Sequence, residues 1–252
     1  LREGEDFTTK RAKGGGGLIR VKNPKENLGK ALEALERAGL ERGKDYTATT
    51  GEGEIRLAMP EGLWTIAWKA KKGDPRAKAV LNQLLEVADR LGVREYFDKR
   101  IRPIELAGTK SAVGRKVALE KEGVAVEITG FKVEWVKFEN TNEACNWPKE
   151  LCRPKVIVEY AHGGGEGRFT VTWGVKGRDN AIYANVDVAN KLDRAAALIA
   201  VAVQEGDEDE IKRIVDKAKR GGAVTLYLKN LLAMAQYDES LLEWAMRVKR
   251  TT

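Results

Sequence analysis

The segment KVIVEYAHGGGEGRFTVTWGV, residues 155–175, decides the fold of the second half of the chain. Apolar residues alternate with others on both sides of its glycines: Val156, Val158 and Tyr160 before them, and Phe169, Val171, Trp173 and Val175 after them. Strict alternation of this kind is typical of β-strands. We therefore predict a β-hairpin whose apolar residues face one another across a glycine loop, with His162 as a turn residue rather than a base.

Strands and then helices are predicted around this hairpin. Residues 124–140 and 180–188 alternate in the same way and predict two further strands. From residue 190 onward the pattern is helical, apart from a short strand predicted at 223–228. The acidic run 207–210 opens one of these helices, where carboxylates interact favourably with the helix dipole. We interpret it as a helix start rather than a metal site.

The first half of the chain predicts an antiparallel sheet with helices. Residues 5–22 read as two strands joined by a glycine-rich turn, and residues 23–39 as a helix with one apolar stripe. Residues 45–59 and 62–72 alternate again and read as strands. The last of these strands would place its large apolar side chains on one face: Trp64, Ile66 and Trp68.

Two helices complete this half, a long one that opens at Asp74-Pro75 and a shorter one over about 94–101, before Pro103. The order ββαββα is typical of an antiparallel sheet with helices on one face. We therefore predict an α+β protein in three parts: a basic domain at 1–103, a connector at 104–123, and a β-rich domain with C-terminal helices at 124–252.

Positive charge is concentrated in the first part of the chain. Of the 45 Lys+Arg and 38 Asp+Glu residues, residues 1–103 hold 22 and 16, so almost all of the net charge of +7 lies there. A basic domain indicates a polyanionic partner, most commonly nucleic acid. We predict that an exposed sheet face contacts the phosphates of DNA or RNA through Lys10, Arg11, Lys13, Arg20, Lys22, Lys69, Lys71 and Lys72. Trp64 or Trp68 would stack an unpaired base if exposed.

Both cysteines lie in the segment NTNEACNWPKELCRPK, residues 140–155. A structural zinc site needs four ligands, and the sequence offers only these two thiols and the distant His162. A catalytic thiolate is usually activated by a neighbouring His, and none is close in the sequence. We therefore predict a disulfide between Cys145 and Cys152, with two reduced, buried thiols as the alternative.

Few residues are available for catalysis, because the chain has one His and two Ser, and no nucleotide-binding glycine pattern opens a helix. We predict no catalytic residue, metal ligand or cofactor, and favour a non-catalytic nucleic-acid-binding protein. Two alternatives stay open. In the first, residues 124–252 bind a protein or ribonucleoprotein partner. In the second, the protein is a metal-dependent nuclease, with Glu52 and Glu54 as its candidate metal-binding carboxylates.

The composition is rich in Lys and Glu and holds only three Gln, a balance that is usual in hyperthermophile proteins. Intracellular disulfides are accepted in such organisms. No apolar run is long enough to span a membrane. We therefore expect a cytoplasmic protein without a membrane partner. Because the chain begins at Leu1 rather than Met, a secretory leader stays an open alternative.

Several segments resemble the PaREP-type paralogous proteins of hyperthermophilic archaea, second class, b subgroup: LNQLLEVADRLGVREYFDKR, AGTKSAVGRKV, VEWVKFENTNEACNWPKELCRPKV, FTVTWGV and GGAVTLYLKNLLAMAQY. The resemblance covers most of the chain from about residue 18, and the two-cysteine segment is its most specific piece. It implies a multi-copy archaeal product and no particular reaction, cofactor or catalytic residue.

Residues 5–92 are also similar in element order to a repeat of the LAGLIDADG homing endonucleases, whose sheets form a saddle on DNA. Those enzymes take a metal-binding acid from an apolar helix that ends in a small-acidic pair, and no such helix precedes residue 5 here. This analogy implies a half-site or an inactive descendant.

Overall fold

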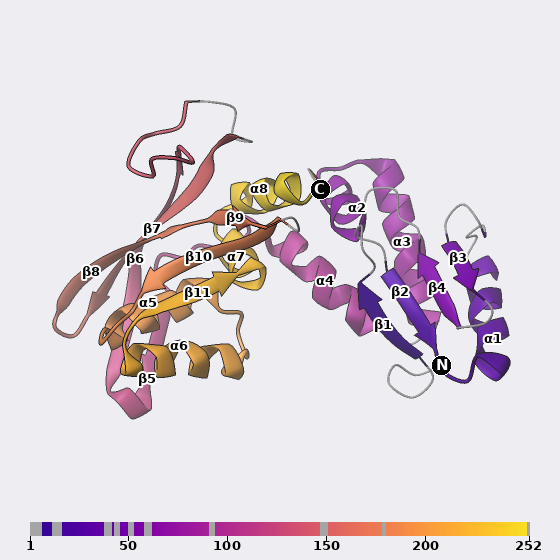
Figure 1. Ribbon diagram of the computed structural model, residues 1–252, viewed down its shortest axis with the longest axis horizontal. Helices are drawn as coiled ribbons and strands as arrows, with labels where there is room; N and C mark the ends of the chain where they lie inside the picture. Colours follow the sequence, from indigo (N-terminus) through magenta and orange to yellow (C-terminus); the bar gives the residue numbers. More distant parts are fainter. Residues whose placement is uncertain are drawn as a thin grey trace. The chain divides into compact units, whose positions relative to one another are not determined.

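A computed structural model describes residues 7–11, 17–37, 42, 46–49, 53–57, 62–90, 94–146, 151–177 and 180–250 (Figure 1). The chain divides into two compact units, Leu1–Glu105 and Leu106–Thr252. Each unit combines helices with antiparallel sheet, so the predicted α+β class is confirmed. No helix among the described residues is long and apolar enough to cross a membrane.

The first unit contains a four-stranded antiparallel sheet in the order β1-β2-β4-β3 (Figure 1). Its strands are β1 (Phe7–Arg11), β2 (Gly17–Val21), β3 (Tyr46–Thr49) and β4 (Glu54–Leu57). The helix α1 (Pro24–Arg37) packs against β2. Ile19 of β2 lies opposite Ile55 of β4, and both are buried, so β-branched side chains form the core of this sheet.

Three helices follow: α2 (Gly62–Lys71), α3 (Pro75–Arg90) and α4 (Arg94–Leu106). The predicted strand at 62–72 is therefore wrong. Trp64, Ile66 and Trp68 alternate in the sequence, but the buried positions include Leu63, Ile66 and Ala67, which have helical spacing. Aromatic and β-branched residues favour strands, and packing against α3 overrides that local preference.

The helix α4 continues through Pro103 instead of ending before it. Pro103 is buried, so the apolar contact of its ring offsets the lost backbone hydrogen bond. The expected connector at 104–123 is also structured: its first residues finish α4, and Lys116–Leu119 form β5. A 3₁₀ turn, Glu120–Glu122, then leads to Gly123.

The second unit contains two antiparallel sheets. One has the order β5-β6-β7-β8, with β6 (Val124–Val136), β7 (Arg153–His162) and β8 (Gly165–Thr172). In the predicted hairpin Val156 lies opposite Val171 and Val158 opposite Phe169, which confirms the expected pairing there. Val175 belongs instead to β9 (Gly174–Lys176), which pairs with β10 (Ala181–Asp187); β11 (Ala223–Tyr227) completes this second sheet.

The helix α5 (Leu192–Ala202) lies at the centre of the second unit. Its residues Ala195–Ala202 are all buried, since the helix packs against β6 and also against α6 (Glu208–Arg220) and α7 (Leu228–Ala235). Small alanine side chains allow this close packing on every side. The last helix, α8 (Glu239–Arg250), packs against α7, with Leu241, Leu242 and Trp244 buried.

Candidate functional site

The predicted basic residues of the first hairpin are only partly placed. Lys10 and Arg11 lie in β1, where the structure describes the backbone and not these side chains. Lys13 lies outside the described residues. Lys22 is exposed just after β2 ends. A continuous basic sheet face therefore stays a prediction.

Arg20 is exposed, but its charge is balanced by a carboxylate. Its Nη2 and Nε atoms donate to Glu54 Oε1 at 2.6 and 3.1 Å, and Glu54 is buried. Glu54 thus serves an ion pair, and Glu52 lies outside the described residues. In the part of the chain that the structure describes, no group of three or more His, Cys, Asp or Glu side chains is arranged to hold a metal ion.

The remaining predicted lysines lie on a helix instead of a strand end. Lys69 and Lys71 belong to the last turn of α2, and Lys72 follows it. The Nζ of Lys71 donates to the carbonyl oxygens of Ile104 and Glu105 at 3.1 and 3.2 Å. The Nζ of Lys72 lies 4.5 Å from the centre of the half-buried Trp68 ring. Lys71 is therefore tied to the end of α4, while Lys72 lies over an aromatic face.

Three residues, Lys72, Gly73 and Asp74, join α2 to α3 in a sharply defined turn. Gly73 has a φ of 91°, which glycine adopts without strain. The Asp74 N–H bonds to the Lys69 carbonyl at 3.0 Å and the Gly73 N–H to the Ala70 carbonyl at 3.1 Å, the two bonds of a Schellman stop. The next helix begins at once, because Asp74 Oδ1 accepts the N–H groups of Arg76 and Ala77.

This region, which we call the α2–α3 corner, comprises residues 69–78. It holds five basic residues and one acid: Lys69, Lys71, Lys72, Arg76, Lys78 and Asp74. Arg76 and Lys78 are exposed, and neither has a carboxylate in ion-pair range among the described residues. Asp74 is half-buried as the helix cap. The corner is therefore a compact source of positive potential.

The outer face of α3 continues from the corner and was missed by the sequence reasoning. Asn82 and Gln83 are exposed there, with no hydrogen-bond partner among the residues that the structure describes. Ala77, Leu84 and Ala88 are buried on the opposite side. The helical period would have placed the two amides on the solvent side, and this was the available signal.

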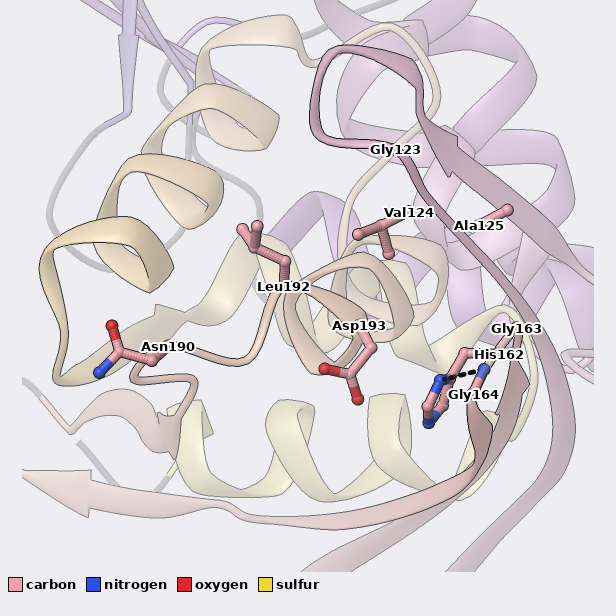
Figure 2. A pocket seen from close by; sticks show the side chains of 9 residues that line it. All are labelled: Gly123, Val124, Ala125, His162, Gly163, Gly164, Asn190, Leu192 and Asp193. Atoms are coloured by element: carbon pink, nitrogen blue, oxygen red, sulfur yellow. Dashed lines mark hydrogen bonds between the residues drawn. The ribbon is translucent and has the colours of Figure 1, made fainter.

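A hollow of about 500 Å³ in the second unit lies beside the glycine turn of the β7–β8 hairpin (Figure 2). Figure 2 shows His162, Asp193 and Asn190 around it. The Nδ1 of His162 accepts the Gly164 N–H at 3.2 Å, so this histidine stabilises the turn, as the sequence predicts. Aspartate at the start of α5 makes the hollow unsuited to an anion.

Tyr160 in β7 is buried, and its hydroxyl donates to Asp193 Oδ2 at 2.5 Å. Burial, together with this carboxylate, raises the pKa of Tyr160 to about 12. Burial opposes ionisation of Asp193, but the bond from Tyr160 lowers the pKa of Asp193 overall. A neutral phenol and an occupied carboxylate are poor proton carriers at neutral pH. The pair instead ties β7 to the first turn of α5.

The acidic run 207–210 serves as the start of α6, in agreement with the sequence interpretation. Asp207 Oδ1 accepts the Glu210 N–H at 3.1 Å. Glu210, whose side chain is 3% exposed, lies 2.7 Å from Arg213 Nη2 and 2.8 Å from Lys229 Nζ. Burial raises the pKa of Glu210, but hydrogen bonds from Arg213, Lys229 and Asn230 outweigh it and lower the pKa to about 2. These charged side chains therefore pair with one another and stabilise the fold.

Comparison with known proteins places the chain in one family. Residues 1–250 match the family model described as PaRep2b protein. The chain belongs to the PaRep2b family. This confirms the PaREP-type resemblance read from the sequence, whereas the likeness to LAGLIDADG endonucleases is not supported. No curated protein and no solved structure matches the chain.

In this PaRep2b chain the two cysteines form the predicted disulfide, with Sγ atoms 2.05 Å apart. Cys152 is buried, and its carbonyl accepts the indole N–H of Trp244 at 3.0 Å, which fixes the segment to α8. Nearby, Phe138 and Leu151 are 42% and 55% exposed. A protein partner for residues 124–252 stays a prediction.

Proposed function

We propose that this PaRep2b protein is a non-catalytic nucleic-acid-binding protein, and that the α2–α3 corner is its phosphate-contacting surface. The observation that supports this is the concentration of five basic residues against one acid within residues 69–78, with that acid engaged as a helix cap. Cations gathered at a protein surface attract phosphates and release condensed counterions on binding.

This proposal moves the contact surface from the sheet to the helices. Arg20 is balanced by Glu54, whereas Arg76 and Lys78 are exposed without such a partner among the described residues. Lys69 and Lys72 extend the same positive surface at the end of α2. Lys71 contributes its charge but is held by the carbonyl groups that end α4. A nuclease is not proposed here, because Glu54 serves the ion pair with Arg20 and Glu52 lies outside the described residues.

The test is a salt titration of binding to labelled duplex DNA, single-stranded DNA and RNA, measured by fluorescence anisotropy. The double variant Arg76→Ala/Lys78→Ala should lower the slope of log affinity against log salt by about 1.8 on duplex DNA, the share of two phosphate contacts. The matched control is Lys25→Ala/Lys30→Ala, which removes the same charge from exposed positions of α1 in the same unit.

The control variant should keep most of the affinity and nearly the whole slope. Equal losses in both variants would show that only net charge matters, and would remove the corner as the contact surface. An absence of binding to every probe at about 50 mM salt, where electrostatic contacts are strongest, would overturn the proposed function itself.

A further inference from the structure

Residues 76–83 of α3 present a side-chain set that phosphate contacts alone do not require. Arg76, Ala79 and Gln83 follow the spacing i, i+3, i+7, which places them on one stripe of the helix, and Asn82 adjoins it. All four are exposed. The stripe lies away from the side of the helix that Ala77 and Leu84 bury.

The chemistry of this stripe matches base edges in the major groove of DNA. Asparagine or glutamine pairs with the N6 and N7 atoms of adenine, while Arg76 at the start of the stripe would contact a phosphate. Alanine makes apolar contact with the methyl group of thymine. The Asn82 and Gln83 amides have no partner among the described residues that would hold them back from such contacts.

The backbone around the stripe has the connection that helix-turn-helix units use. Two packed helices are joined by a three-residue turn that contains glycine, and the second helix offers its N-terminal residues. Lys69 lies in the last turn of the first helix, Lys72 follows that helix directly, and Lys78 lies in the first turn of the second, so cations lie close to the stripe. Cations in these positions would hold the two phosphate backbones that border a groove.

The charge along α3 indicates which part of the helix approaches the groove. Arg76 and Lys78 lie in its first turn, whereas the exposed acids Glu86 and Asp89 lie near its end, where Arg90 is the last residue. Asp89 also accepts a bond from Arg94 Nη1 at 2.8 Å. Repulsion between these carboxylates and the phosphates disfavours groove contact beyond Gln83, so contact is confined to residues 76–83.

We infer that α3 enters the major groove of duplex DNA and reads base edges with Asn82 and Gln83, which gives the protein a sequence preference. This inference rests on the proposed function and narrows it to B-form duplex. The B-DNA major groove, about 12 Å wide, admits an α-helix. The major groove of A-form RNA is too deep and narrow for side chains to read.

The experiment is selection of sequences from a random duplex DNA pool by the wild-type chain at about 150 mM salt, followed by affinity measurements on the selected and a scrambled duplex. A short preferred sequence should emerge. The variant Asn82→Ala/Gln83→Ala should lose about tenfold or more of the preference for it, the size of one good base contact. Its affinity for the scrambled duplex and its salt slope should stay at the wild-type values, because no cation is removed.

The remaining outcomes separate the two proposals. If no sequence is enriched, or if single strands or RNA bind more tightly than every duplex, base reading by α3 is wrong. In that case a loss of affinity in Arg76→Ala/Lys78→Ala would still support phosphate contact at the α2–α3 corner. If no nucleic acid binds, both the base reading and the proposed function are wrong. Alanine is a good helix former and both amides are exposed, so the double variant should fold with an unchanged circular dichroism spectrum and melting temperature.

Discussion

The start of α6 and the α2–α3 corner are both rich in charge, yet they use charge in opposite ways. At the start of α6 the Glu210 carboxylate is nearly inaccessible to solvent and pairs with Arg213 and Lys229. At the corner, Arg76 and Lys78 are exposed with no carboxylate in range among the described residues. The first arrangement stabilises the fold, and the second is available to an external anion.

The largest effect that this comparison predicts belongs to the α6 network. Glu210→Gln should lower the free energy of unfolding by about 3 kcal/mol, because it leaves the partners of a buried carboxylate without their counter-charge. Denaturant unfolding measures this loss. The affinity for nucleic acid should not change under conditions where the variant is folded. A variant that kept full stability would break the distinction between the two regions.

Acid should lower the free energy of unfolding of the wild-type protein by a similar amount, because it protonates Glu210. The pKa of Glu210 is lowered in the folded state, from an ordinary value of 4.5 to about 2. The stabilisation is therefore fully present above pH 4.5 and is lost as the pH falls through 2. We expect a loss of about 3 kcal/mol from this group. Glu210→Gln should lose correspondingly less over the same pH range, and parallel pH curves for the two proteins would contradict the assignment.

The disulfide provides an intermediate effect in the same unit as Glu210. Cys145→Ser/Cys152→Ser should lower the free energy of unfolding by about 2.5 kcal/mol, the chain-entropy value for so short a loop. Reducing the wild type should have a similar effect on its denaturant midpoint. Nucleic-acid affinity should stay constant, since the disulfide lies outside the unit that contains the corner. A fall in affinity would point to a binding surface in residues 106–252.

The smallest effect concerns the cap of α3. Asp74→Ala removes the oxygen that accepts two backbone N–H groups and should cost about 1 kcal/mol of stability. Asp74→Asn keeps a capping oxygen, so it should lower stability by only a few tenths of a kcal/mol. Because it also removes a negative charge, it should strengthen binding to DNA. Equal melting temperatures for the two variants would show that the cap is unimportant.

The second unit was largely predictable from its sequence because its signals are strong and separate. Strict alternation on both sides of the glycines gives the β7–β8 pairing, and the acids before Ile211 mark the start of α6. The disulfide followed from the lack of other partners for two nearby thiols. Trp173 marks the limit of that reasoning, since the strand predicted through it ends there and Val175 joins the other sheet.

The first unit was harder to predict because a short apolar run suits either a strand or a buried helix. In α2 the aromatic residues alternate as in a strand, whereas the buried residues Leu63, Ile66 and Ala67 follow helical spacing. That error placed Lys69, Lys71 and Lys72 at a strand end and hid the turn that begins α3. The ion pair between Arg20 and Glu54 joins residues far apart in the chain, so no local sequence pattern predicts it.

The most direct test of the α2–α3 corner is the salt dependence of duplex binding for Arg76→Ala/Lys78→Ala beside Lys25→Ala/Lys30→Ala. Both variants should match the wild-type stability within about 0.5 kcal/mol, since each removes exposed side chains. We predict that the slope falls by about 1.8 for the first variant and hardly at all for the second. Identical slopes in the two variants, or a wild-type affinity that does not depend on salt, would contradict this account.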